Sequence, residues 1–426
     1  MLDLKRIRYE TDAVKEQLAK RPDPSLAAAV DEVVELDEAR RQVIQSVEEL
    51  KARRNAASKE IARRKKTGED ASDLIGEMKE VAERISRFDA RLSADESRIE
   101  ELLLCIPNTP LPPVPSGDES ANREIRSWGE PLEPARWHRP HWDLGAALGI
   151  LDLERGAKIS GSGFPVYIGT GARLQRALIN FMLDTHRKEH GYTEVQLPYL
   201  VRTEAMVGTG QLPKLADDAY HIEGDDLWLI PTGEVPLTNL HAGEVLGPED
   251  VPRHYVAYTA CFRREAGAAG RDTRGVLRVH QFDKVELVRV ERPDDSQEAL
   301  EELTGQAEAI LQRLGLAYRV VLLAAGDMAQ SSAMTYDLEV WSPGVGRWLE
   351  VSSCSNCTDY QARRAEIRYR REPRGKPEFV HTLNGSGLAL PRTVIALLEN
   401  YQREDGSVDL PEALHPYMES TRIEPV

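Results

Sequence analysis

This chain contains little cysteine, few aromatic residues and no long hydrophobic run. Its 426 residues include four cysteines, and aromatic residues make up 6% of the composition. Four cysteines are too few for the disulfide framework of a small secreted protein. No apolar stretch approaches the ~20 residues that cross a bilayer, and the charged, amphipathic N-terminal segment is unlike a signal peptide. We therefore expect a cytoplasmic protein without a membrane segment.

The cysteine pattern also fails to predict a metal or redox centre. Cys354 and Cys357 form one CxxC pair, whereas a structural zinc ion needs four ligands. No second CxxC occurs in the sequence. No thioredoxin-like helix pattern follows the pair, so neither zinc nor a redox role is expected.

The net charge of −16 argues against a protein that coats nucleic acids in general. One window, residues 51–66, is an exception, with eight basic residues and a single acid, Glu60. A concentrated basic patch on an acidic protein indicates a localised site for a polyanion, although a solvated helix face is an alternative. The basic residues are Lys51, Arg53, Arg54, Lys59, Arg63, Arg64, Lys65 and Lys66.

The spacing of apolar residues places this window near the tip of a helical hairpin. One series of seam positions runs from Val33 to Ile61 and a second from Leu74 to Leu102, in alternating steps of three and four. This is the period of a left-handed coiled coil. The two series are mirror images, so the predicted hairpin centre falls at Thr67–Gly68.

The same register makes local predictions about the hairpin. Gly68 should end the first helix, and Asp70 or Ser72 should cap the second. Arg40 should face Asp95 in one layer of the seam, where such a pair fixes register more than it stabilises. A first helix of about 40 residues would be ~60 Å long.

A proline-rich segment at residues 106–117 marks a domain boundary, because it cannot be helical. Beyond residue 130 the pattern predicts an amphipathic helix over 170–189 and a strand over 193–197. Long insertions between strands favour an antiparallel sheet with packed helices over regular βαβ units. Gly169 and Gly171 match neither a dinucleotide fingerprint nor a P-loop.

The most informative stretch is residues 261–286, where two strand-like runs flank a loop rich in glycine and arginine. Glycine lets the backbone approach a ligand closely, and arginine binds phosphate or carboxylate with two hydrogen bonds. The stretch therefore predicts a site for a polyanionic ligand rather than a solvated basic loop. Its arginines are Arg263, Arg264, Arg271, Arg274 and Arg278.

This stretch resembles motif 2 of the class II aminoacyl-tRNA synthetases, in the form found in seryl-tRNA synthetases. The helix and strand over 170–197 resemble motif 1, which forms the dimer interface in that class. Four further segments match the seryl family in the expected order, and the last continues to Arg392 like motif 3. They are Pro231–Asn239, Glu350–Asn356, Gln361–Arg364 and His381–Gly387.

The resemblance implies an α+β chain with three parts. Residues 1–108 would form a tRNA-binding domain with an antiparallel two-helix coiled-coil arm, and residues 109–130 a linker. Residues 131–426 would form a class II catalytic domain, an antiparallel β-sheet flanked by helices. The implied enzyme is a homodimeric ATP-dependent ligase that forms seryl-adenylate and transfers the seryl group to tRNA(Ser), and to tRNA(Sec) where present.

The resemblance also implies roles for individual residues, with ATP as a substrate and Mg²⁺ as a cofactor. Arg263 would contact both the serine carboxylate and the α-phosphate, and Arg392 the outer phosphates; these two are the catalytic candidates. The serine pocket would consist of Thr232, Glu234, Arg263, Glu286 and Ser386. ATP would contact Arg263, Arg264, Glu265, Val279, Phe282, Glu350, Val351, Ser352, Ser353 and Arg392, and Glu350 and Ser353 would hold Mg²⁺.

Physical chemistry supports these residue types. The first nucleophile, a carboxylate, is already an anion, so catalysis rests on positioning and charge neutralisation rather than on a general base. A pocket that hydrogen-bonds a hydroxyl rejects alanine, whereas threonine must be excluded by size. The basic window would contact the long variable arm of the tRNA.

The sequence departs from the family pattern at two positions, and three other functions are alternatives to the one that the resemblance implies. Gly233 stands where many relatives have Ala or Ser, and Pro391 where many have Gly; proline is acceptable near a helix start. The other functions are an enzyme that loads serine onto a carrier protein, a specialised second copy, and a non-catalytic coiled-coil scaffold. The basic arm argues against the first and the intact set of candidate residues against the last.

Overall fold

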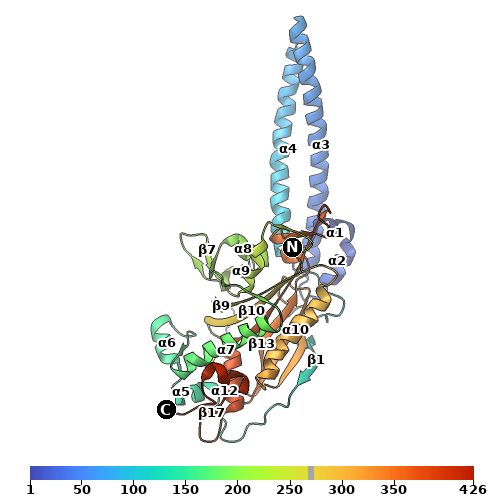
Figure 1. Ribbon diagram of the computed structural model, residues 1–426. Helices are drawn as coiled ribbons and strands as arrows, with labels where there is room; N and C mark the ends of the chain where they lie inside the picture. Colours follow the sequence, from blue (N-terminus) through green and yellow to red (C-terminus); the bar gives the residue numbers. More distant parts are fainter. Residues whose placement is uncertain (267–272) are drawn as a thin grey trace. The chain divides into compact units, whose positions relative to one another are not determined.

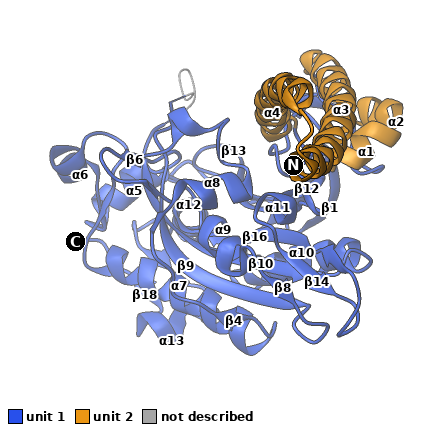
Figure 2. Ribbon diagram, turned by 90° about the horizontal axis from the view of Figure 1, so that it is seen from above, with its two compact units in different colours: residues 1, 20–22, 107–426 blue, residues 2–19, 23–106 orange. Residues whose placement is uncertain are grey.

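A computed structural model describes residues 1–266 and 273–426 of the chain. It divides into two compact units, shown in different colours in Figure 2. The first unit comprises residues 1, 20–22 and 107–426, and the second residues 2–19 and 23–106. Part of the motif 2-like loop, including Arg271, lies outside the described residues.

The second unit is helical, and its two long helices form a hairpin (Figure 1). It contains α1 (Leu4–Tyr9), α2 (Thr11–Leu18), α3 (Ser25–Thr67) and α4 (Ser72–Cys105). Gly68 ends α3 with a left-handed backbone conformation, φ 76°. Oδ1 of Asp70 accepts the backbone N–H of Ser72 at 3.0 Å. The predicted hairpin and its turn at Gly68 are confirmed, whereas the expected cap at Asp70 or Ser72 is wrong: the N-cap of α4 is Ala71, which makes no side-chain cap hydrogen bond.

The predicted seam is present, but its polar layer differs in detail. Leu50 and Ile85, which the register paired, belong to one buried cluster. Arg40, however, forms an ion pair with Glu96 at 3.2 Å, whereas Asp95 lies 3.6 Å from Arg91. The expected Arg40–Asp95 pair is wrong by one residue. Arg40 also pairs with Asp37 of its own helix at 3.3 Å, and Asp37 is 1% exposed, so the guanidinium has two acidic partners without Asp95.

The first unit is built on an eight-stranded sheet in the order β1-β11-β12-β13-β16-β10-β9-β4. Its neighbouring strands are antiparallel except for β4 and β9, so the predicted antiparallel sheet is confirmed. β1 falls within the segment expected to be a linker. The strands are β1 (Arg123–Trp128), β4 (Thr193–Glu194), β9 (Arg253–Phe262), β10 (Gln281–Glu291), β11 (Tyr318–Leu322), β12 (Met334–Ser342), β13 (Arg347–Asn356) and β16 (His381–Ala389).

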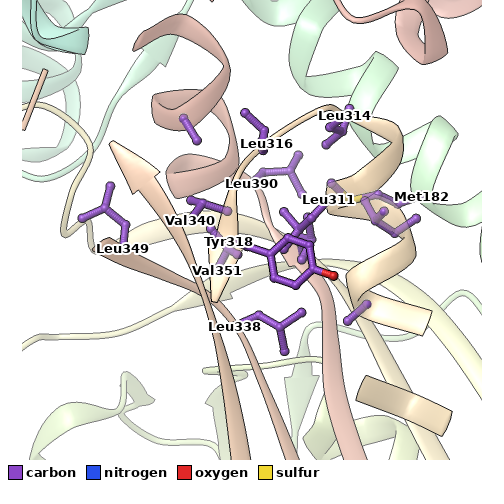
Figure 3. Close-up of a cluster of buried hydrophobic side chains, with 14 of the residues drawn as sticks. Met182, Leu311, Leu314, Leu316, Tyr318, Leu338, Val340, Leu349, Val351 and Leu390 are labelled. Carbon is purple, nitrogen blue, oxygen red and sulfur yellow. The ribbon is translucent and has the colours of Figure 1, made fainter. Parts of the chain in front are cut away.

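Three long helices cover this sheet: α7 (Thr170–Lys188), α10 (Ser296–Arg313) and α12 (Leu390–Tyr401). The helix predicted over 170–189 is therefore α7, and the strand after it is shorter than expected. Figure 3 shows part of the core, where Met182, Leu311 and Leu390 meet strand residues such as Tyr318 and Leu338. This packing fixes the strands that carry the site.

Shorter elements complete the first unit. The helices are α5 (His141–Ala147), α6 (Leu153–Ser160), α8 (Thr203–Thr209), α9 (Glu234–Thr238), α11 (Tyr360–Arg364) and α13 (His415–Met418), with 3₁₀ turns at Glu119–Ala121, Ala216–Asp218, Asn239–His241 and Glu412–Leu414. The strands are β2 (Leu151–Asp152), β3 (Val166–Tyr167), β5 (Leu200–Val201), β6 (His221–Ile222), β7 (Leu227–Leu229), β8 (Val245–Leu246), β14 (Arg368–Arg370), β15 (Pro377–Phe379), β17 (Val408–Asp409) and β18 (Arg422–Ile423).

The structure also bears on the expectations about membrane segments and cysteines. Within residues 1–266 and 273–426, no helix is both long and apolar enough to cross a membrane. All four cysteines are free thiols, and Cys354 and Cys357 are buried.

Candidate active site

A polar cavity of about 810 Å³ lies within the first unit. Most of the predicted site residues line it, although they are distributed over 160 positions of sequence. They are Thr232, Glu234, Arg263, Glu265, Val279, Phe282, Glu286, Glu350, Val351, Ser353, Ser386 and Arg392. Two predicted residues do not line it. Arg264 is exposed, and Ser352 is buried with its hydroxyl donating to the backbone oxygen of Ser386 at 2.7 Å.

Strand β10 supplies the central row of side chains. Successive side chains of a strand point to opposite faces, so Phe282, Lys284 and Glu286 share one face. All three line the cavity. Glu286 lies opposite Ser386 of β16 in the sheet register. The row therefore runs from an aromatic ring at one end of β10 to a carboxylate deeper in the sheet.

The deeper end of the cavity is a small polar pocket around Glu286. Oε2 of Glu286 accepts the hydroxyl of Thr232 at 2.8 Å and also forms an ion pair with Lys284. Glu286 is 2% exposed and Thr232 is 4% exposed. A buried carboxylate next to a buried hydroxyl offers strong, directional partners to a small polar ligand.

Glu234 adds a second carboxyl group to this pocket. Its Oε1 accepts the side-chain amides of Gln361 at 2.6 Å and Asn384 at 3.1 Å. Burial, and then the neighbouring charge of Glu286, raise the pKa of Glu234 to about 7. Lys284 neutralises one of the two carboxyl groups, and the other can pair with a ligand that brings its own positive charge.

The opposite end of the cavity combines an aromatic ring with arginine. The Arg263 guanidinium lies over the Phe282 ring, 5.2 Å from the ring centroid. Glu265 forms an ion pair with Arg278, and both side chains line the cavity. A flat aromatic ring, a carboxylate and two guanidinium groups suit a ligand with a heterocycle and phosphate groups.

Arg392, which also lines the cavity, contacts Glu350 on β13. Its Nη1 donates to the backbone oxygen of Glu350 at 2.8 Å and to Oε2 at 3.1 Å. Burial acts to raise the pKa of Glu350, but the charges of Arg392 and Arg263 hold it below its usual value. Burial and the Glu350 charge raise the pKa of Asp337 well above normal.

These two carboxyl groups fit a hard cation bound together with a substrate. Oδ1 of Asp337 is buried and has no hydrogen-bond partner among the described residues. The described part of the chain contains no group of three His, Cys, Asp or Glu side chains arranged to hold a metal ion. An ion such as Mg²⁺ would therefore need further oxygen ligands, and substrate phosphates commonly supply them.

Sequence reasoning missed several polar residues of the cavity, and three of them, Lys284, Asp337 and Asn384, lie beside predicted site residues or carry a chemical role in the site. Two of them carried a usable signal. Lys284 lies two positions from Phe282 and from Glu286, and Asn384 two positions from Ser386, so strand alternation places them on the same faces. Asp337 lies outside every recognised motif and is brought to the cavity by the pairing of β12 with β13.

The chain matches two known families. Residues 1–110 match the family described as "Seryl-tRNA synthetase N-terminal domain". Residues 219–401 match the "tRNA synthetase class II core domain (G, H, P, S and T)". The second match contains most of the cavity residues.

Individual proteins are similar over nearly the whole chain. A serine--tRNA ligase of Geobacillus kaustophilus is 56% identical over 419 residues, covering 98% of each chain. The crystal structure of a Pyrococcus horikoshii seryl-tRNA synthetase complexed with ATP covers 100% of both chains at 40% identity, with a TM-score of 0.94. A cytoplasmic serine-tRNA ligase of Naegleria fowleri in complex with AMP has 31% identity and a TM-score of 0.88, covering 100% of this chain and 99% of its own.

Proposed function

The chain belongs to the seryl-tRNA synthetase family of ATP-dependent serine--tRNA ligases, which act in protein biosynthesis, and we propose how its cavity performs that reaction. The observation that carries the proposal is the division of one cavity into a small, buried, anionic pocket and an arginine-rich, aromatic end. Serine fits the first and ATP fits the second, with the reacting atoms between them.

Serine would bind at the small end. Its ammonium would face the carboxylates of Glu286 and Glu234, and its hydroxyl would take a hydrogen bond in the same pocket. Thr232 already donates to Glu286, and Ser386 is its neighbour across the sheet. Because these polar groups are buried, an analogue without a hydroxyl would leave one of them unsatisfied.

ATP would bind at the other end. Adenine would lie on the Phe282 ring beside the Val279 backbone, and its amino group would donate to Glu265. The Arg392 side chain would bind the outer phosphates. Glu350 and Ser353 are the proposed ligands of Mg²⁺, which would neutralise phosphate charge, and the unpartnered oxygen of Asp337 lies on the same cavity wall.

Arg263 would connect the two substrates. A serine carboxylate oxygen attacks the α-phosphorus of ATP, the bond to the bridging oxygen breaks, and pyrophosphate leaves. A guanidinium contacting both the carboxylate and the α-phosphate orients the attack and offsets the negative charge that accumulates at phosphorus. A terminal ribose hydroxyl of the tRNA then attacks the seryl carbonyl and releases AMP.

The helical unit would bind the tRNA. We assign residues 1–108 to a tRNA-binding domain, 109–130 to the linker and 131–426 to the catalytic domain. We expect tRNA(Ser) as the partner, with tRNA(Sec) where that species is present. The chain would work in the cytoplasm as a homodimer, with α7 and β4 at the interface, as the motif 1 resemblance implies.

Ion pairs within the helical hairpin indicate which basic residues of the window 51–66 are available to bind tRNA phosphates. Arg63 is paired with Glu60 and Glu69, Arg64 with Glu60 and Asp73, and Arg53 with Glu77. The other basic residues of the window have no ion pair among the described residues, so they bind phosphate without first losing a partner. They are Lys51, Arg54, Lys59, Lys65 and Lys66.

Binding of two non-hydrolysable adenylate analogues tests the pocket assignment. The seryl analogue should bind at least about a hundredfold more tightly than the alanyl analogue, because the hydroxyl satisfies buried groups. Glu286→Gln should weaken the seryl analogue while AMP affinity stays close to that of the unsubstituted chain. Loss of AMP binding with retained discrimination between the analogues would contradict the assignment.

A further inference from the structure

A chain of buried hydrogen bonds connects α12 with the returning limb of the motif 2-like loop. His141, the first residue of α5, and Glu399, on α12, both have fully buried side chains. Nδ1 of His141 lies 2.9 Å from Oε1 of Glu399. The backbone amide of Val276 donates to Nε2 of the same ring at 3.1 Å. Val276 and the next three residues, 277–279, line the cavity at its nucleotide end.

These contacts define the protonation of the ring. Because Nε2 accepts a backbone N–H, it carries no proton, and the single ring proton lies on Nδ1 and is donated to Glu399. Glu399 also accepts the backbone amides of His141 and Gly344, both at 2.9 Å, and of Val345 at 3.2 Å, together with the hydroxyl of Ser342. A carboxylate held by this many donors keeps the imidazole in one orientation.

The backbone of the loop lies so close to the His141 ring that the residue before Val276 must be glycine. Gly275 has a φ of +62°, a conformation that other residues rarely adopt. A Cβ atom at this position would lie 2.1 Å from Nε2 of His141. The backbone of the loop therefore lies directly against the ring.

We propose that His141, oriented by Glu399, is a positioning residue that holds segment 275–279 in place for ATP. The inference rests on the proposed function because it takes ATP to occupy this end of the cavity. His141 does not line the cavity, so it acts through Val276 rather than on the substrate. Displacement of this amide would also move Arg278, the ion-pair partner of the adenine-binding candidate Glu265.

Two near-isosteric substitutions separate the two hydrogen bonds of the ring. An asparagine side chain ends near the position of Nδ1, so His141→Asn retains a donor to Glu399 and loses the acceptor for Val276. A glutamine side chain reaches the position of Nε2, so His141→Gln retains an acceptor for Val276. A general loss of packing would affect both variants alike, whereas the proposed role distinguishes them.

The measurements are the KM values for ATP and serine in serine-dependent ATP–pyrophosphate exchange, and amide hydrogen exchange over residues 273–279. His141→Asn should raise the KM for ATP about five- to tenfold, as expected for loss of one buried hydrogen bond, with the KM for serine unchanged. It should also accelerate exchange of the Val276 amide. His141→Gln should keep both quantities within about twofold of the unsubstituted chain.

Equal KM values for ATP in all three proteins, or an equal rise in both variants, would overturn the proposal. Gly275→Ala provides an independent test with His141 and Glu399 intact, and it should raise the KM for ATP in the same direction. An unchanged KM in that variant would also overturn it. Absence of serine-dependent exchange in the unsubstituted chain would instead contradict the proposed function, and the Val276 amide would still report on the contact.

Discussion

Serine binding should strengthen as the pH rises from 6 to 8, because Glu234 must ionise before it can pair with the serine ammonium. Burial and the charge of Glu286 raise the pKa of Glu234 to about 7 in the substrate-free cavity. With that pKa, about one tenth of the Glu234 side chains are ionised at pH 6 and about nine tenths at pH 8. The KM for serine should therefore fall about tenfold over this range.

The assay is serine-dependent ATP–pyrophosphate exchange at saturating ATP, with the KM for serine measured at intervals between pH 6 and pH 8. Among the described residues that line the cavity there is no histidine, so Glu234 is the carboxyl group of the serine pocket expected to titrate here. Glu234→Gln, which cannot ionise, should bind serine weakly and with no pH dependence. A flat profile in the unsubstituted chain, or a similar tenfold change in Glu234→Gln, would refute the reasoning.

The raised pKa of Glu234 should also make the fold less stable as the pH rises, whereas serine binding becomes stronger over the same range. The pKa of Glu234 is raised from 4.5 to about 7, so the folded chain holds this proton more tightly than the unfolded chain does. Stability is therefore lost as the pH rises from 4.5 to 7, by at most roughly 3 kcal/mol. Glu234→Gln should unfold at higher denaturant concentration than the unsubstituted chain above pH 7, and at a similar concentration near pH 4.5. Such an exchange of stability for function is common at binding sites.

Three further predictions concern catalysis and the helical hairpin. Arg263→Ala should lower the pyrophosphate-exchange rate about 10²- to 10³-fold with little change in melting temperature, and a near-normal rate would exclude Arg263 from the mechanism. Replacement of residues 40–95 by a short glycine-containing turn should leave adenylate formation intact and abolish transfer to tRNA; normal charging would show that the hairpin is not the grip. Charge reversal at Lys59, Lys65 and Lys66 should raise the KM for tRNA and flatten its salt dependence, whereas reversal of the exposed Arg87, outside the basic window, should have a smaller effect.

Local sequence signals predicted the elements whose geometry depends on near neighbours. The hairpin turn followed from Gly68, because a left-handed cap acts within a few residues. The strand pair around the motif 2-like loop followed from two short apolar runs and is observed as β9 and β10. The family resemblance identified the candidate site residues, and the fold places most of them around one cavity.

Long-range pairing explains what the sequence did not reveal. β1 lies in the segment expected to be a linker and becomes a strand through its partner β11, almost 200 residues later. Asp337 reaches the cavity because β12 pairs with β13, and no local pattern encodes that register. Arg40 pairs with Glu96 and Asp37 rather than with Asp95, because heptad spacing fixes the layer of a residue but not which neighbouring acid its long side chain contacts.

The most direct test of the account is amino-acid-dependent ATP–pyrophosphate exchange by the purified chain, followed by charging of tRNA. The account predicts exchange with serine, exchange at least about a hundredfold slower with alanine, and transfer of the seryl group to tRNA(Ser). Exchange that is equally fast with serine and alanine would contradict the assignment of the buried pocket around Thr232, Glu234 and Glu286. Exchange with serine but no transfer to tRNA(Ser) would contradict the role proposed for the helical unit.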